Sequence, residues 1–299
     1  MLTSKMARYP ATTEIRLIGA RSSGKTTYLA TLAHLPHQKQ LESQFPGLAV
    51  TYDKNSEAGK LARMAEDIIK KGTKLAGTNR GNVNNLPYYY FRIQIPSRKG
   101  LPGTEIELTV RDFAGEIFHD IPLEHKWHEI QSYIDDLFTA QSWMVMLTDW
   151  QPSQDTRLYK PALEKLCQEI SEREQVNREI KNLRIAVVMS KCERGEIWPC
   201  RLEPEEDLFK VRLPQTYRFL TKKFPPRTNR LKFFACSSFG VLSSRPNDFD
   251  PRPNRYIPDD GSPADYNAFL RSPSQWHPFG LISPIYWLST GKTLHDQHL

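Results

Sequence analysis

The sequence has few cysteines and no long hydrophobic run, and each shortage excludes a class of protein. Four cysteines among 299 residues, none spaced as Cys-x-x-Cys, exclude a disulfide-stapled scaffold and a thiolate zinc finger. No apolar run approaches the roughly 18 residues that a membrane-spanning helix needs. The polar start of the chain lacks the apolar stretch of a secretory signal. We therefore expect a cytoplasmic protein with reduced thiols and no transmembrane segment.

The excess of positive charge is small. Lysine and arginine total 41 against 34 acidic residues, which gives a formal net charge of +7. An excess of this size is typical of a soluble protein with somewhat basic surfaces. No ribonucleoprotein, zinc-finger or basic-helix signature accompanies it. Nucleic acid is therefore not expected as a partner.

Short apolar runs alternate with helical stretches along the chain. Apolar or alternating runs predict strands over residues 14–18, 87–95, 104–110, 143–147, 183–189 and 231–236. Helical patterns predict helices over residues 25–35, 56–69, 125–140, 158–181 and 204–222. The apolar and aromatic segment 278–289 predicts a docking helix or a turn followed by a helix. Pro214 predicts a kink or break in the fifth of these helices. Strands separated by helices predict an α/β fold, a three-layer sandwich around a mostly parallel sheet.

One pair of strands departs from this alternation. The link between residues 87–95 and 104–110 contains two prolines and two glycines, which predicts a β-hairpin and hence one antiparallel edge strand. No linker divides the chain, so we expect one elaborated domain over residues 1–299. An insertion is expected at about residues 36–75, and an irregular C-terminal extension at about residues 241–299.

The strongest motif begins where the first predicted strand ends. The run GARSSGKT from Gly19 to Thr26 matches the P-loop pattern G-x-x-x-x-G-K-[ST] in full. A predicted helix follows it. Glycines allow the backbone to wrap a phosphate, and the helix N-terminus adds partial positive charge. We expect Lys25 to reach the β- and γ-phosphates and the Thr26 hydroxyl to bind Mg²⁺. The expected phosphate-binding residues are Gly19, Ala20, Arg21, Ser22, Ser23, Gly24, Lys25, Thr26 and Thr27.

A second motif, Asp112-Phe113-Ala114-Gly115-Glu116, follows the predicted strand 104–110. An acid at the end of a strand beside the P-loop strand can hold Mg²⁺, usually through water, so Asp112 is the second expected metal residue. Gly115 can present its N–H to a γ-phosphate. Together the two motifs resemble the P-loop GTPases of the translation-factor and Ras-like class, in which D-x-x-G begins the second switch.

This resemblance implies roles for further residues. Glu116 stands where Ras-like proteins carry the glutamine that orients the attacking water; the alternative is a solvent-exposed glutamate that opens a helix. A carboxylate accepts a hydrogen bond from water but is repelled by phosphate, so hydrolysis is expected to be slow without a partner. Arg21 could contact phosphate in cis or crowd out an incoming arginine finger. In the first switch, Thr78 is expected to close over Mg²⁺, with Thr73 as the alternative.

Two further loops resemble the base-recognition elements of the same class. The tetrapeptide Ser190-Lys191-Cys192-Glu193 resembles [NT]-K-x-D, in which the acid pairs with guanine and the lysine packs on the base. Here serine and glutamate replace the usual residues, and Glu193 offers the same two acceptors displaced by one methylene. A polar turn after a strand is the alternative. Ser237 and Ser238, after the last predicted strand, resemble the loop that touches the base through backbone N–H groups.

The segments GARSSGKTTYLATL, RDFAGEIF and PFGLISPIYWL are together most like the bacterial double-GTPase type of domain. This resemblance implies a Mg²⁺-dependent GTPase that hydrolyses GTP to GDP and signals to a protein partner, within a multi-component and often conflict-related bacterial system. Two alternatives stay open. One is a nucleotide-binding scaffold with little turnover, and the other is a P-loop ATPase or kinase.

Overall fold

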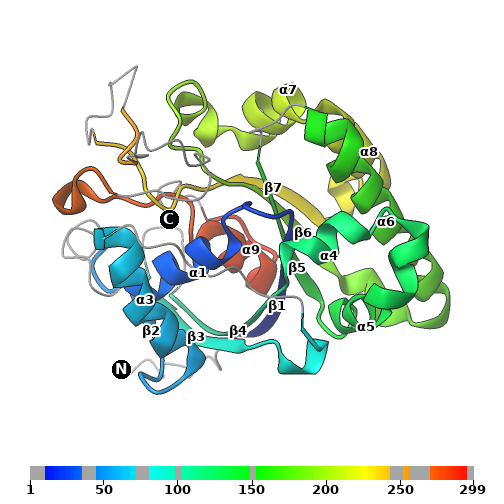
Figure 1. The fold of residues 1–299 in the computed structure, drawn as a ribbon, viewed down its shortest axis with the longest axis horizontal. Coiled ribbons are helices and arrows are strands. Elements are labelled where there is room, and N and C mark those ends of the chain that lie inside the picture. The colour runs from blue at the N-terminus through cyan, green and yellow to red at the C-terminus, as the bar shows by residue number, and fades with distance from the viewer. Residues whose placement is uncertain are drawn as a thin grey trace, which may run out of the picture.

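The computed structural model places a central sheet between two layers of helices (Figure 1). The structure describes residues 11–35, 45–71, 81–97, 103–148, 153–242, 252–255 and 270–294. Within these residues no helix is both long enough and apolar enough to cross a membrane. The boundaries of a single domain at residues 1 and 299 stay a prediction.

The sheet has seven strands in the order β2-β3-β4-β1-β5-β6-β7. The strands are β1 (Ala11–Gly19), β2 (Ala49–Thr51), β3 (Tyr88–Ile95), β4 (Thr104–Asp112), β5 (Ser142–Leu147), β6 (Arg184–Met189) and β7 (Leu231–Ala235). The five strands from β4 to β7 in this order are parallel to one another. Because the carboxyl ends of parallel strands meet at one edge, the loops that follow β1, β4, β6 and β7 are brought together there.

The predicted hairpin is present. Strands β3 and β4 pair antiparallel from Tyr88 opposite Arg111 to Ile95 opposite Thr104. Beyond β3 the sheet gains a short strand that the sequence analysis did not predict, since β2 pairs antiparallel with β3 at the edge. The residues expected to form an insertion therefore supply both β2 and the helix α3 (Glu57–Lys71).

Helices cover both faces of the sheet, and this confirms the predicted three-layer α/β sandwich. The helices are α1 (Lys25–His34), α3, α4 (Gly115–Asp120), α5 (Trp127–Leu137), α6 (Lys160–Val176), α7 (Lys210–Arg212), α8 (Pro214–Lys223) and α9 (Ser283–Thr290). Helices α1, α3 and α9 share one hydrophobic core, and α4, α5, α6 and α8 share the other (Figure 1). Strand β5 is buried along its whole length, as its apolar run over residues 143–147 requires.

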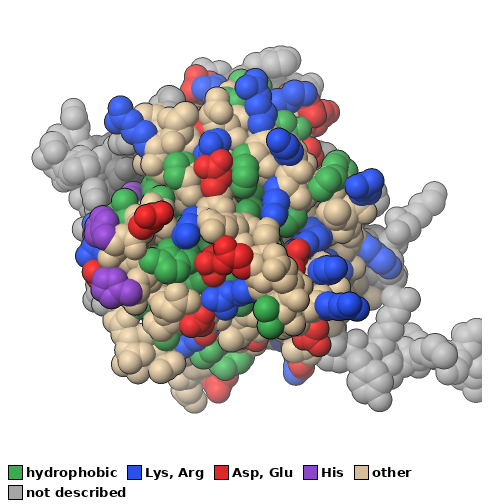
Figure 2. Space-filling view, turned by 90° about the vertical axis from the view of Figure 1, so that its right-hand side faces the viewer, with side chains coloured by type: hydrophobic (Ala, Val, Ile, Leu, Met, Phe, Trp, Pro, Cys, Tyr) green, Lys and Arg blue, Asp and Glu red, His purple; other side chains and the backbone are tan. Residues whose placement is uncertain are grey.

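The surface over α5, α6 and α8 mixes charges of both signs. Figure 2 shows acidic and basic side chains interspersed on this side of the molecule. Several of them form ion pairs with one another, among them Lys160 with Glu164 at 2.7 Å and Arg173 with Asp135 at 2.6 Å. A mixed surface of this kind does not concentrate the single-sign field that would attract a polyanion.

The break predicted at Pro214 is also present. The chain runs as a π-helix over Pro204–Phe209 and continues as α7, leaves helical geometry at Leu213, and starts again as α8. The buried carboxylate of Asp155 accepts hydrogen bonds from the backbone N–H groups of Gln215 and Thr216, at 2.8 and 2.9 Å. Asp155 therefore caps the new helix from a distant part of the chain.

We expect the change Asp155→Ala to lower the free energy of unfolding by about 1–2 kcal/mol, because two N–H groups at the start of α8 lose their acceptor. Urea unfolding followed by circular dichroism measures the change. The exposed Glu206→Ala is the control and should shift the midpoint little. Equal shifts for both variants would show that Asp155 is not a structural cap.

Candidate nucleotide-binding site

The loop between β1 and α1 has the backbone geometry of an anion cradle. Gly19, Ser22 and Gly24 have φ angles of 151°, 59° and 86°. A Cβ atom at Gly19 would lie 2.2 Å from the carbonyl oxygen of Met146, so only glycine fits there. Gly24 is the N-cap of α1, a helix of ten residues. The loop therefore ends where unpaired backbone N–H groups and the helix dipole favour negative charge.

Lys25 folds back across this loop. Its Nζ donates hydrogen bonds to the carbonyl oxygens of Gly19 at 2.9 Å and Ala20 at 3.1 Å. The side chain is buried, and desolvation lowers the pKa of Lys25, while the negative charges of Asp112 and Glu116 oppose that shift. An anion entering the loop would satisfy the ammonium group more fully than two carbonyl oxygens do.

The two predicted metal residues lie side by side. The Thr26 hydroxyl donates a hydrogen bond to Asp112 Oδ2 at 2.9 Å. This contact follows from the parallel pairing of β1 with β4, which sets Leu17 opposite Asp112. Hydroxyl and carboxylate oxygens are ligands that suit Mg²⁺, and Mg²⁺ is usually held by one or two protein groups together with phosphates. Among the described residues no cluster of three or more metal-binding side chains offers a closed cage. The donor set therefore fits Mg²⁺ shared with a phosphate ligand.

The D-x-x-G loop packs directly on the P-loop. A Cβ atom at Gly115 would lie 2.5 Å from the backbone nitrogen of Arg21, so glycine permits this close approach. Next to it, Arg21 and Glu116 form an ion pair at 2.9 Å. In the sequence these two residues are separate departures from the usual pattern, whereas the structure pairs them. Burial and the nearby Arg21 charge lower the pKa of His119 on the same helix.

Ser190 connects the predicted base-recognition tetrapeptide, of which it is the first residue, with the P-loop. Its hydroxyl is buried and lies 2.6 Å from the carbonyl oxygen of Ser23 and 3.2 Å from that of Leu147. Ser190 is a substitution in the tetrapeptide and is not among the predicted site residues. Its position at the end of a strand parallel to β1 was the available signal.

The residues expected to recognise the base lie in two loops that contact each other, one that follows Ser190 and one that contains Ser237 and Ser238. Lys191 has a left-handed backbone with φ 61°. Glu193 is 1% exposed, and its Oε2 accepts a hydrogen bond from the Ser237 hydroxyl at 2.8 Å. The carbonyl oxygen of Ser238 accepts a hydrogen bond from Trp276 Nε1 at 2.7 Å. The structure thus joins the two base loops, and it also shows that the Glu193 carboxylate is enclosed by protein.

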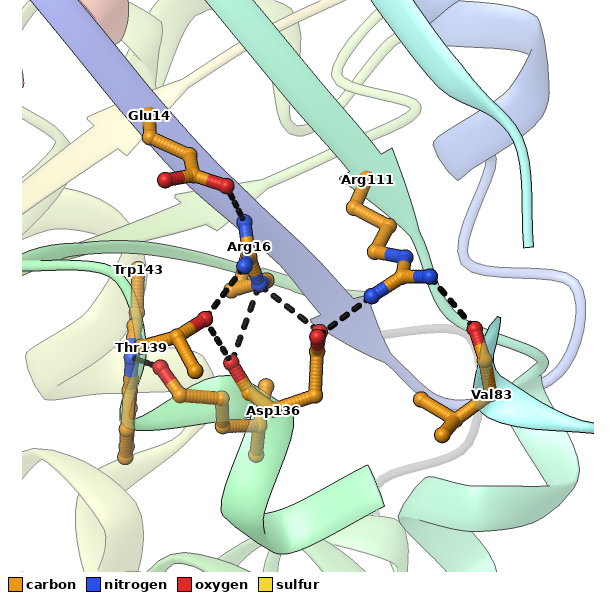
Figure 3. Close-up of polar contacts among 8 residues, drawn as sticks. Glu14, Arg16, Val83, Arg111, Asp136, Thr139 and Trp143 are labelled. Carbon is orange, nitrogen blue, oxygen red and sulfur yellow. Dashed lines mark hydrogen bonds and ion pairs between the residues drawn. The ribbon is translucent and has the colours of Figure 1, made fainter. Parts of the chain in front are cut away.

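The first-switch candidates Thr78 and Thr73 lie outside the described residues. The chain that follows them is anchored at two points. The Tyr133 hydroxyl donates a hydrogen bond to the carbonyl oxygen of Gly81. Arg111 Nη2 donates a hydrogen bond to the carbonyl oxygen of Val83 (Figure 3). The role of Thr78 as a switch residue stays a prediction.

An ionic cluster with two buried arginines connects the elements that carry the site. Asp136 of α5 lies between two arginines, with Oδ2 2.8 Å from Nε of Arg16 and Oδ1 paired with Nη1 of Arg111 (Figure 3). Arg16 also pairs with Glu14 at 2.7 Å and is 1% exposed. Arg111 directly precedes Asp112, and Arg16 lies on the P-loop strand. The cluster therefore fixes β1, β4 and α5 relative to one another.

We expect Asp136→Asn to lower the free energy of unfolding by about 3–5 kcal/mol, because two buried arginines lose their shared counter-charge. Denaturant unfolding measures the loss. The neighbouring Asp135→Asn is a matched control, since Asp135 is 55% exposed and pairs with Arg173 at the surface. A loss at position 136 no larger than that at 135 would contradict the assignment.

Comparisons with known proteins give only distant likenesses. No protein-family model matches the chain, and no curated protein matches its sequence. Solved structures that resemble it include Sup35 complexed with GDP (12% identity, TM-score 0.33) and the S. cerevisiae Ski7 GTPase-like domain bound to GTP (14% identity, TM-score 0.36). Methanosarcina barkeri Roco2 RocCORdC bound to GDP is another (14% identity, TM-score 0.31). The matches cover 79%, 84% and 77% of this chain but 40%, 47% and 45% of the other chains. The chain thus spans less than half the length of these structures. Structural similarity at these TM-scores does not support the assignment of a family or a function. The resemblance to P-loop GTPases therefore rests on the sequence motifs and the strand order.

Proposed function

We propose that this chain is a Mg²⁺-dependent GTPase that binds guanine nucleotide and hydrolyses GTP to GDP and phosphate in the cytoplasm. The observation that carries the proposal is the hydrogen bond of 2.9 Å between Thr26 and Asp112 at the mouth of the Gly19–Thr26 loop. The order of β1, P-loop and α1, followed by β4 and the D-x-x-G loop, supports it. So does the meeting of the two base loops at the same edge of the sheet.

Different residues of the site would bind different parts of the phosphate chain and its metal ion. The amides from Ala20 to Thr27 would donate to the β- and γ-phosphates, and Lys25 would exchange its carbonyl partners for phosphate oxygens. Thr26 and Asp112 would hold Mg²⁺, which when bound neutralises charge on the transferred group. Gly115 would donate its N–H to the γ-phosphate, and Thr78 would complete the site from the first switch.

Glu116 would accept a hydrogen bond from the attacking water. Its charge alone would repel the γ-phosphate, and the ion pair with Arg21 offsets that repulsion. The same pair restrains Glu116, so turnover would be slow until a protein partner rearranges it. Loss of the γ-phosphate would release Gly115, and the partner would respond to that difference. We place such signalling in a bacterial multi-component conflict system, as the double-GTPase resemblance implies.

Two alternatives have an observation in their favour. The Arg21–Glu116 pair favours a scaffold that binds nucleotide with little turnover, since it engages the group that would orient water. The enclosure of Glu193 favours a P-loop ATPase or kinase, since guanine must reach that carboxylate to be recognised. GTP and ATP titrations, together with phosphate release, separate the three functions.

We expect Lys25→Ala to reduce phosphate release by about 100-fold or more, because the γ-phosphate loses a preorganised cationic donor. A coupled phosphate assay and titration with a fluorescent guanine nucleotide measure hydrolysis and binding separately. Lys222→Ala, exposed on α8, is the control. Unchanged hydrolysis in Lys25→Ala would exclude the P-loop as the site. Background release from a wild-type protein that still binds GTP would favour the scaffold.

We expect Arg21→Ala to weaken GTP binding up to about fivefold relative to GDP, because Glu116 then faces the γ-phosphate without its counter-charge. The ratio of the two dissociation constants is the measurement. Adding Glu116→Gln to Arg21→Ala should restore the ratio, since the repelling charge is gone. A ratio that stays at the wild-type value in Arg21→Ala would show that the pair does not act on phosphate binding.

A further inference from the structure

The carboxylate of Glu193 is held unequally at its two oxygens. Oε2 accepts the hydrogen bond from Ser237, whereas Oε1 is buried and accepts no hydrogen bond within the described part of the chain. Among the ion pairs of the described residues, Oε1 pairs with Nη1 of Arg255 at 3.7 Å. At that distance the two atoms form an ion pair but are too far apart for a hydrogen bond. One acceptor of the predicted base-recognition carboxylate therefore has a charge partner and no N–H donor.

Arg255 is placed there by specific contacts rather than by a loose surface loop. The neighbouring Asn254 is fully buried, its N–H donates to the carbonyl oxygen of Gly240 at 3.0 Å, and its side chain makes two hydrogen bonds with the backbone of Ser272. Pro253 pairs with Val241 in an isolated bridge. Arg255 itself is 8% exposed. The segment 252–255 is thus fixed on the loop that carries Ser237.

The physical chemistry of this contact explains why an arginine is present. A carboxylate that is 1% exposed carries a large desolvation cost, which a nearby cation offsets. At 3.7 Å the offset is incomplete, because a charge-assisted hydrogen bond would lie near 2.8 Å. A ligand edge with N–H donors would satisfy Oε1 better. Guanine presents two neighbouring donors on one edge, whereas adenine presents one donor beside an acceptor.

We propose that Arg255 is a specificity-determining residue that occupies the Glu193 carboxylate in competition with the guanine base. This inference rests on the proposed function, because it assigns Glu193 to base recognition. Guanine must displace the guanidinium to reach Oε1, so the measured affinity is the intrinsic affinity reduced by the cost of that exchange. Phosphate binding at the Gly19–Thr26 loop does not involve Arg255 and is independent of it.

Removal of the arginine should therefore strengthen guanine binding. In Arg255→Ala the free protein retains a buried carboxylate without its cation, and a bound guanine edge relieves that cost. We expect the dissociation constant for GDP to fall about tenfold. The constants for ADP and for inorganic tripolyphosphate should stay within twofold of wild type. Arg255→Gln, which keeps a donor and most of the packing, should shift GDP in the same direction and serves if the alanine variant does not fold.

Isothermal titration of the full chain with GDP, ADP and inorganic tripolyphosphate, each with Mg²⁺, tests the proposal. Arg252→Ala is the matched control, because Arg252 is exposed in the same segment; it should change none of the three constants. Weaker GDP binding in both Arg255 variants would overturn competition and make Arg255 a positioning residue for Glu193. An unchanged GDP constant would overturn any role in base binding. The proposed function fails separately if the wild-type protein does not bind tripolyphosphate or does not distinguish GDP from ADP.

Discussion

The hydrogen-bonded register between β1 and β4 is the constraint on which the site depends. It sets Leu17 opposite Asp112, so that the P-loop and the D-x-x-G loop leave the sheet side by side. A slip of one residue would turn Asp112 to the other face of the sheet. Backbone hydrogen bonds alone do not fix this register, because the bonds of a parallel ladder are evenly spaced along the strands. The ionic cluster around Asp136 supports the observed register, in which Arg16 and Arg111 both reach its carboxylate.

The departures from the usual GTPase residues come as matched charge pairs. Glu116 is paired with Arg21, and Glu193 with Arg255. Each acid lies where a phosphate or a base is expected, and each cation comes from a different segment of the chain. A single acidic substitution at either position would leave an uncompensated charge near the ligand. Both unusual acids therefore have a counter-charge within the described part of the chain.

The features that the sequence predicts are those encoded within one segment. The P-loop could be read from Gly19 to Thr26 because its spacing alone dictates the backbone, and the buried strands could be read from runs such as Ser142–Leu147. Strand β2 has three residues, too few for a period to appear. The cluster around Asp136 joins side chains from β1, β4 and α5, which no local pattern brings together. Arg255 could not be identified because its neighbours in sequence show no period, and its contact with Glu193 arises only in the folded chain.

Helix α9 packs in the same hydrophobic core as α1, although the two helices lie far apart in the sequence. The Tyr28 hydroxyl donates a hydrogen bond of 2.5 Å to the carbonyl oxygen of Leu281, and both Tyr28 and Trp287 are 1% exposed. Helix α1 therefore lacks some of the residues it packs against until residues 281–290 have been synthesised. Contacts of such long sequence separation form late, because the intervening chain must first be ordered. During translation, α1 would therefore complete this side of its core only after residues 281–290 have left the ribosome.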